Sequence, residues 1–180
     1  MPHQVLQRPA GDEYAPYFAR YISLVPDGDL VAILQEQLTE LPALLARVGE
    51  ARESFRYAPG KWSVREVAGH LIEVERVFTY RATQFAHGDA RALPGYDQEA
   101  WVPLGAYDGR TLADLVEEWT VARANTVAMV RGLPEGALAR RGIASEMEFS
   151  VLALLCVMPG HVQYHMLRLP VDYSAAFGAG

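Results

Sequence analysis

Two histidines near the C-terminal end of the chain have a spacing that suits metal binding. His161 and His165 close an apolar segment that begins at Ser150, and in a helix they lie one turn apart on the same face. Two imidazoles placed in this way can share one divalent metal ion. No glutamate stands between them, so this is not the His-Glu-x-x-His motif of zinc proteases. Taken alone, the pair has a second explanation: two polar side chains hydrogen-bonded to backbone near a helix end.

A third histidine shifts the balance between these explanations. Ser63 and Glu66 form a capping-box sequence, which predicts a helix that starts at about residue 64 and carries His70 near its second turn. One stripe of this helix recurs at helical spacing and comprises Val67, His70, Val74, Val77, Phe78 and Arg81. His70 thus points where a core residue would point. Buried neutral imidazoles need partners, and a metal ion is one. Three histidines that converge inside one small bundle therefore favour a metal over separate hydrogen bonds.

These motifs resemble those of a known family. The matching segments are Tyr57-Ala-Pro-Gly-Lys-Trp-Ser-Val-Arg-Glu-Val-Ala-Gly-His70, Glu75-Arg-Val-Phe78, Arg81, Leu93-Pro-Gly-Tyr-Asp97 and Gly160-His-x-x-x-His165. Together they are similar to the DinB/YfiT-like superfamily of bacterial four-helix-bundle proteins, from about residue 11 to residue 168. The resemblance implies a divalent metal, zinc or nickel, held by His70, His161 and His165 with one coordination position open. It also implies a homodimer and a small-molecule substrate.

The expected architecture is an all-α four-helix bundle. Apolar residues at helical spacing predict long helices over residues 30–48, 64–87 and 112–131, and a fourth that begins after the capping residue Ser150. A long crossover loop, residues 88–110, joins the second helix to the third, and its most site-like residues are Tyr96, Asp97 and Trp101. Residues 140–149 are expected to form a loop. We divide the chain into an aromatic-rich arm that packs on the bundle (1–26), the bundle itself (27–170) and a C-terminal tail (171–180).

Composition limits the classes of function. The net charge is −6 and no run of basic residues suits a phosphate backbone, so nucleic-acid binding is disfavoured. The single cysteine, Cys156, excludes an intramolecular disulfide and suits a reducing cytoplasm, where its apolar neighbours favour a buried, inert thiol. No segment is long and apolar enough for a membrane span, and the N-terminus has no apolar signal region. The sequence thus predicts a cytoplasmic protein that binds no membrane.

The predicted chemistry is activation of a nucleophile. Three neutral nitrogen ligands leave the metal with its full positive charge, which lowers the pKa of a bound water or thiol. Some members of the superfamily resemble transferases that use a low-molecular-weight thiol such as bacillithiol, and others are described as metal-dependent hydrolases. Glu73, one turn beyond His70, is the candidate partner of a ligand or proton acceptor, unless it is solvated or paired with Arg76. Arg81 and Arg123 are candidates to hold an anionic substrate.

A hypothesis of another class is a bundle without catalytic activity, in which the metal serves as a structural cross-link. Structural zinc sites usually have four protein ligands, often including cysteine. Cys156 is five residues from His161, more than one helical turn away, so a closed site of this kind is disfavoured.

Overall fold

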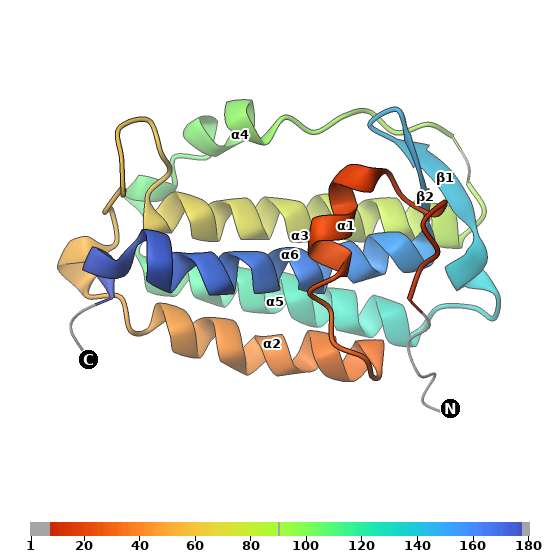
Figure 1. Ribbon diagram of the computed structural model, residues 1–180, viewed down its shortest axis with the longest axis horizontal. Helices are drawn as coiled ribbons and strands as arrows, with labels where there is room; N and C mark the ends of the chain where they lie inside the picture. The colour runs from red at the N-terminus through yellow and green to blue at the C-terminus, as the bar shows by residue number, and fades with distance from the viewer. Residues whose placement is uncertain (1–7, 90, 178–180) are drawn as a thin grey trace.

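Four long helices lie side by side in the computed structural model, which describes residues 8–89 and 91–177 (Figure 1). They are α2 (Leu30–Leu45), α3 (Val64–Ala86), α5 (Leu112–Arg131) and α6 (Val151–Asp172). The expected all-α bundle is confirmed. Neighbouring pairs are α3 with α5, α5 with α2, α2 with α6, and α6 with α3. Helices α2 and α3, which follow one another along the chain, therefore occupy a diagonal of the bundle, and α3 and α6 stand side by side.

Polar side chains fix where the four helices begin. The side chains of Asp29, Ser63, Thr111 and Ser150 each accept a hydrogen bond from a backbone amide of the first turn. At Ser63 the full capping box forms, because the Glu66 carboxylate also accepts from the Ser63 amide at 2.8 Å. These caps fix the residue at which each helix begins, and two of the four helices carry the histidines.

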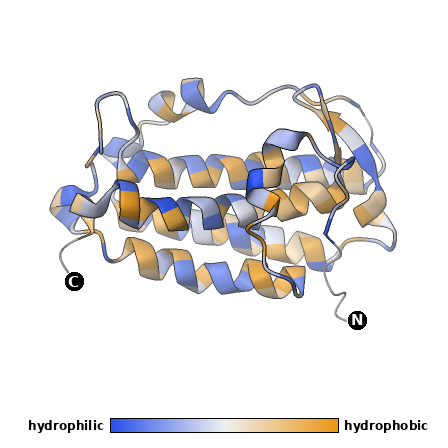
Figure 2. Ribbon diagram, viewed as in Figure 1, coloured by the Kyte–Doolittle hydropathy of each residue, from blue (hydrophilic) through white to orange (hydrophobic). Residues whose placement is uncertain are grey.

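The core consists of two apolar clusters separated by a polar layer. Hydropathy alternates along α2, α3 and α5 between apolar and polar residues, as expected for helices with one buried face (Figure 2). One cluster includes residues 64–72 of α3 and reaches Val162 and Leu169 of α6; the other includes Val74 to Ala86 of α3 and residues 151–158 of α6. Buried polar side chains stand near the boundary of the two clusters along both helices, among them His70, Glu75 and His161.

The N-terminal segment packs against α6. It contains a 3-10 turn (η1, Pro16–Phe18) and the short helix α1 (Ala19–Ile22), and its side chains at Phe18, Tyr21, Ile22 and Val25 are buried. Gly160 of α6 permits this approach, because a Cβ atom there would lie 2.1 Å from the carbonyl oxygen of Tyr21. Residues 1–7, the first part of the expected arm, lie outside the described residues.

The crossover between α3 and α5 runs along α3 and is partly helical (Figure 1). It contains α4 (Gln98–Leu104) and the 3-10 turn η3 (Tyr107–Gly109), both in contact with α3. Asp97 begins α4, since its side chain accepts hydrogen bonds from the amides of Glu99 and Ala100. The long crossover is therefore present as expected. It includes short helical segments that pack against α3.

The expectation of a loop over residues 140–149 is wrong, because these residues form a β-hairpin. Strand β1 (Arg141–Ala144) pairs antiparallel with β2 (Met147–Ser150). Ser145 and Glu146 make the turn with positive φ angles of 54° and 63°, a backbone that usually calls for Asn or Gly. The usual hairpin signal was thus missing from the sequence. The hairpin also holds the start of the crossover, since the Leu93 amide donates to the Ile143 carbonyl at 2.8 Å.

Helix α6 extends to Asp172 and is followed by the 3-10 turn η5 (Ser174–Ala176), with Ala176 and Phe177 buried against the bundle. Residues 171–177 of the expected tail are thus ordered, and residues 178–180 lie outside the described residues. The remaining short turns are η2 (Glu50–Arg52) and η4 (Ala137–Ala139). Within the described part of the chain, no helix combines the length and apolarity that crossing a membrane requires.

Candidate metal centre

The three histidines expected to bind a metal meet between α3 and α6. Nε2 of His161 lies 3.1 Å from Nε2 of His70 and 3.2 Å from Nε2 of His165. One ligand atom from each ring falls within 4.8 Å of the other two. Zinc bonds its nitrogen ligands at about 2.0–2.1 Å, so two ligands of a tetrahedral site are about 3.4 Å apart. The arrangement of the rings can therefore hold a metal ion.

Hydrogen bonding alone does not satisfy the His161 ring. Its Nε2 faces both other rings, yet an imidazole nitrogen has either one hydrogen or one lone pair and makes one such bond. Its Nδ1 is buried and has no hydrogen-bond partner among the described residues. A cation between the three Nε2 atoms accepts all three lone pairs at once. The residues present thus fit a metal better than they fit a hydrogen-bonded histidine cluster.

The three rings are neutral at physiological pH. Burial, followed by repulsion from the neighbouring His165, lowers the pKa of His70 to about 3. Burial also lowers the pKa of His165 to about 4, with a smaller contribution from the positive charge of Arg168. The pKa of His161 is lowered well below its usual value, again mainly by burial. Neutral imidazoles are the form that binds metals, so no proton has to be removed at neutral pH.

Tyr96 connects His70 to a carboxylate. Its hydroxyl donates to Oε2 of Glu73 at 2.7 Å, and its oxygen lies 3.3 Å from Nδ1 of His70. Because the hydroxyl hydrogen is used toward Glu73, the tyrosine oxygen is left to accept a hydrogen from Nδ1 of His70. Burial and the bond to Glu73 raise the pKa of Tyr96, which keeps the phenol protonated. This chain places the hydrogen of His70 on Nδ1 and leaves the Nε2 lone pair free for a metal.

A second tyrosine of the crossover binds the same carboxylate. The Tyr107 hydroxyl donates to Oε1 of Glu73 at 2.7 Å, so both carboxylate oxygens of Glu73 accept a phenol hydrogen. The Tyr107 ring lies between two glycines: a Cβ on Gly69 would come within 2.3 Å of it, and so would a Cβ on Gly105. Sequence reasoning missed Tyr107, although a glycine directly before His70 in mid-helix was a usable sign of close packing.

Arg81 is not brought to the histidines. It lies eleven residues beyond His70 on α3, which is about 16 Å along the helix axis. Its guanidinium donates to the Pro94 carbonyl at 3.1 Å and to the Ser145 hydroxyl at 2.9 Å. Arg81 thus links α3 to the crossover and to the hairpin turn, and these contacts occupy one edge of its guanidinium.

The Arg123 guanidinium binds partners inside the core. It is fully buried, and its guanidinium donates to both carboxylate oxygens of Glu75, at 2.9 and 2.8 Å, and to Gln37 at 2.6 Å. Gln37 in turn donates to the carbonyl of Pro159, so this network joins four helices in the polar layer of the core. Its charge is compensated inside the protein.

The three histidines are not joined by His87, Trp101 or Cys156. His87 caps the end of α3, where its Nδ1 contacts the Thr83 carbonyl. Trp101 is half exposed and packs edge-on against the Tyr96 ring. Cys156 is buried, and no cysteine or carboxylate of the described residues joins the three histidines as a fourth ligand. A metal held here would keep a coordination position open.

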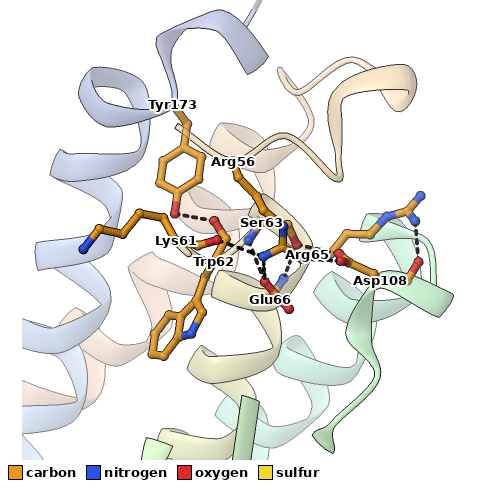
Figure 3. Close-up of polar contacts among 8 residues, drawn as sticks. All are labelled: Arg56, Lys61, Trp62, Ser63, Arg65, Glu66, Asp108 and Tyr173. Atoms are coloured by element: carbon orange, nitrogen blue, oxygen red, sulfur yellow. Dashed lines mark hydrogen bonds and ion pairs between the residues drawn. The ribbon is translucent and has the colours of Figure 1, made fainter. Parts of the chain in front are cut away.

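A cavity of about 240 Å³ leads to the centre. His165 and Trp62 are among its lining residues, and the Trp62 ring lies 4.8 Å from the ring of His70. The segment that carries Trp62 is held in place by the Tyr173 hydroxyl, which donates to the Trp62 carbonyl at 2.9 Å (Figure 3). The wall of the cavity at Trp62 is therefore tied to the residue that follows α6, and a small molecule in the cavity can contact His165.

Comparison with known proteins agrees with this fold. A sequence model of the DinB superfamily matches residues 33–169. YfiT from Bacillus subtilis, described as a probable metal-dependent hydrolase with an unusual four-helix bundle topology, superposes with a TM-score of 0.70 at 16% identity, over 97% of this chain and 95% of YfiT. A DinB-like protein, YjoA, also from Bacillus subtilis, gives a TM-score of 0.59 at 17% identity, over 84% of this chain and 92% of YjoA. A search of curated proteins found no significant match.

Proposed function

Because this chain belongs to the DinB superfamily, we propose that it is a metal-dependent hydrolase that holds one divalent cation between His70, His161 and His165. The observation that carries the proposal is the position of Nε2 of His161, 3.1 and 3.2 Å from the two other Nε2 atoms, which a single hydrogen bond cannot satisfy. A divalent cation with three neutral nitrogen ligands would lower the pKa of a coordinated water or thiol. The description of YfiT as a probable metal-dependent hydrolase favours water as the nucleophile.

The protein would orient the histidine ligands of the metal. In this proposal Glu73 acts through Tyr96 to hold His70 in the tautomer that ligates, as carboxylates do behind many metal-bound histidines. Both of its oxygens already accept phenol hydrogens, which supports a positioning role over proton transfer. Arg81 would act at a distance, by holding the crossover that carries Tyr96.

There are two candidates for the metal and two for the nucleophile. A donor set of three imidazoles suits zinc and nickel alike, so availability decides between them. A low-molecular-weight thiol such as bacillithiol is the other nucleophile expected from the family, and it would transfer its sulfur to an electrophilic small molecule. A structural cross-link would bind the same metal without turnover. The experiment below has one result for each of these cases.

The test begins with metal content, measured by elemental analysis on protein purified without a histidine tag. We expect about one divalent metal per chain in the wild type and loss of the metal in His70→Ala and His161→Ala. His87→Ala is the matched control, because His87 is on the same helix but outside the cluster, and it should retain the metal. A wild type that stays metal-free after incubation with zinc and with nickel would overturn the proposal.

Activity assays then separate the remaining cases. Metal-loaded protein is incubated with a panel of activated esters and amides in water, and with electrophiles in the presence of a small thiol. Turnover in water alone that disappears in His161→Ala supports hydrolysis. Turnover that requires the thiol assigns the S-transfer reaction, and bound metal without turnover in either assay leaves the structural cross-link.

We also infer a homodimer from the family resemblance, and a location in the cytoplasm from the single cysteine. A surface cavity of about 650 Å³ between α3 and α5 supports the first part, because the exposed Tyr80 and Val121, 60% and 66% accessible, are among its lining residues. Sedimentation velocity on the wild type and on Val121→Asp tests it. A monomer at micromolar concentration would contradict it.

A further inference from the structure

The cavity that leads to the three histidines contains a cation without a partner. Lys61 is the only lysine in the chain, and it lines this cavity together with His165. Its side chain is exposed, and the described residues offer its ammonium group neither a hydrogen bond nor an ion pair. Figure 3 shows the side chain extending toward α6, away from the neighbouring network of Arg56, Glu66 and Asp108.

The backbone that carries Lys61 is held firmly. Its amide donates to the Ala58 carbonyl at 3.2 Å, and its carbonyl accepts from the Arg56 guanidinium at 2.9 Å. Trp62, the next residue, is held by Tyr173, and Ser63 caps α3 (Figure 3). The Lys61 ammonium is thus at the end of a flexible side chain on a hydrogen-bonded backbone. It can reach a ligand without movement of the cavity wall.

The other charges of the cavity show which ligand suits it. Arg168, its second cation, is already paired with Asp172 at 2.7 Å. Glu99 of α4 also lines the cavity, and its carboxylate has only a long contact of 3.4 Å with the amide of the adjacent Gln98. One free cation and one free carboxylate in a small space favour a ligand with a single negative charge over a dianion such as a phosphate monoester.

Most of the other lining residues have an aromatic or apolar body. They are Tyr57, Trp62, Val67, Tyr164, Leu169 and Tyr173, and Gly60 and Gln98 complete the lining. Such walls suit the hydrocarbon or aromatic body of a small molecule, while a few polar groups fix its orientation. Trp62 contacts both this cavity and the His70 ring, so a molecule lying on the indole would reach toward the metal centre.

We propose that this cavity binds the substrate of the metal centre, and that Lys61 binds a carboxylate group of that substrate. The substrate class is a small monocarboxylate with an apolar body, oriented so that its hydrolysable bond lies at the His165 end. This proposal rests on the hydrolase function for the identity of the ligand as a substrate. The binding of a carboxylate at Lys61 can be tested without turnover.

The binding test uses the fact that the chain has a single lysine. Reductive methylation with isotopically labelled formaldehyde marks Lys61 and the α-amino group only, and preserves the positive charge. Metal-loaded protein is titrated with benzoate, with its neutral isostere benzamide and with phenyl phosphate, and the methyl signals are followed by NMR. We expect benzoate to give a saturable shift of the Lys61 signal, phenyl phosphate a weaker one and benzamide none. Equal responses to benzoate and benzamide, or no response to either, would overturn the proposal.

Variants connect the signal to the charge of the lysine. Lys61→Gln should weaken benzoate binding about fivefold or more, and Lys61→Arg should restore most of it, because the charge is the same. Arg131→Gln is the matched control, since it removes one exposed positive charge at the end of α5, and it should bind benzoate like the wild type. Weakening of equal size in Arg131→Gln would assign the effect to net charge and reject a subsite at Lys61.

A pair of esters tests the same subsite in turnover. Water cleaves the acyl–oxygen bond of para-nitrophenyl acetate to give acetate and para-nitrophenol, and it cleaves mono-para-nitrophenyl succinate to give succinate and the same phenol. We expect Lys61→Gln to lower the ratio of kcat/KM for the succinate ester to kcat/KM for the acetate ester about tenfold. Hydrolysis of both esters with no change in their ratio would reject the subsite and retain the hydrolase. A benzoate shift without hydrolysis of either ester would retain the subsite and reject the hydrolase.

Discussion

The hydroxyl oxygen of Tyr96 lies 3.3 Å from Nδ1 of His70, and this contact joins the crossover to the metal centre. Tyr96 precedes α4 by two residues, and His70 is near the start of α3. Because the Tyr96 hydroxyl hydrogen points to Glu73, the contact determines which nitrogen of His70 carries a hydrogen. The crossover therefore holds His70 in the tautomer whose Nε2 lone pair is free for a metal.

Removing the hydroxyl of Tyr96 should weaken metal binding without unfolding the protein. In Tyr96→Phe the ring remains and His70 loses the acceptor at Nδ1, so we expect metal affinity to fall by about 10- to 100-fold. Competition with a chromophoric chelator measures the change. Tyr80→Phe is the matched control, because Tyr80 is an exposed tyrosine on the helix that carries His70, and the metal affinity of this variant should equal that of the wild type. An unchanged affinity in Tyr96→Phe would show that the tautomer is fixed in another way.

Gly69→Ala should destabilise the protein, against the usual preference of helices. In a helix interior, Gly→Ala normally stabilises by about 1 kcal/mol. Here the added Cβ would lie 2.3 Å from the Tyr107 ring, so the ring and its bond to Glu73 must move, at a cost of about 1–3 kcal/mol. Denaturant unfolding measures the net effect.

The same substitution in a Tyr107→Ala background provides the control. With the ring removed, no atom of Tyr107 opposes the Cβ, and Gly69→Ala should become neutral or stabilising. The reversal of sign is the expected result. Equal destabilisation in both backgrounds would mean that Tyr107 is not the cause.

The positions of the three histidines could be predicted from the sequence because each depends on local signals. The spacing of His161 and His165 needs only a helix, and the Ser63 and Ser150 caps set where the two helices begin. That the helices are neighbours could not be obtained from periodicity and came from the family resemblance. Local rules thus assign each histidine to one face of its helix, and the family resemblance predicts that these two helices are neighbours.

The parts that sequence reasoning missed depend on contacts between distant segments. The turn at Ser145 and Glu146 adopts a positive-φ conformation without the usual residues, so the hairpin gave no signal. A role of Arg81 and Arg123 in holding an anionic substrate stays a prediction. Their contacts in the structure have no local sequence signal, because the partners are up to 86 residues away in the chain. The sequence shows Lys61 only as part of the family motif. Its place in a cavity depends on residues of α4 and α6, which are distant in the chain.

Cys156 should be nearly inert in the native protein. Burial raises the pKa of its thiol to about 12, the charges of Arg8 and Glu13 having smaller and opposite effects. At pH 8 the thiolate fraction would be about a thousandfold below that of a free cysteine with an ordinary pKa of about 8.5, and the thiolate is the reactive form. We expect slow alkylation by iodoacetamide in the native state and rapid alkylation in guanidinium, measured by mass spectrometry. Similar rates in both states would contradict the burial of this thiol.

Removing one charge of the buried Glu75–Arg123 ion pair should destabilise the protein more than removing both. Both side chains are almost fully buried, and Thr126 also donates to Glu75, at 2.6 Å. Arg123→Met leaves the Glu75 charge buried without its cation, and we expect a loss of about 3–5 kcal/mol in the free energy of unfolding.

Neutralising Glu75 in the same variant should restore part of this loss. In the double variant Arg123→Met with Glu75→Gln no buried charge remains, while the amide of the new glutamine can still bond Thr126, so the double variant should be more stable than Arg123→Met alone. Denaturant unfolding of the wild type, both single variants and the double variant completes the cycle. Additive losses would show that the two charges do not interact. A coupling of several kcal/mol would show that this pair joins α3 to α5 inside the core, five residues beyond His70 on α3.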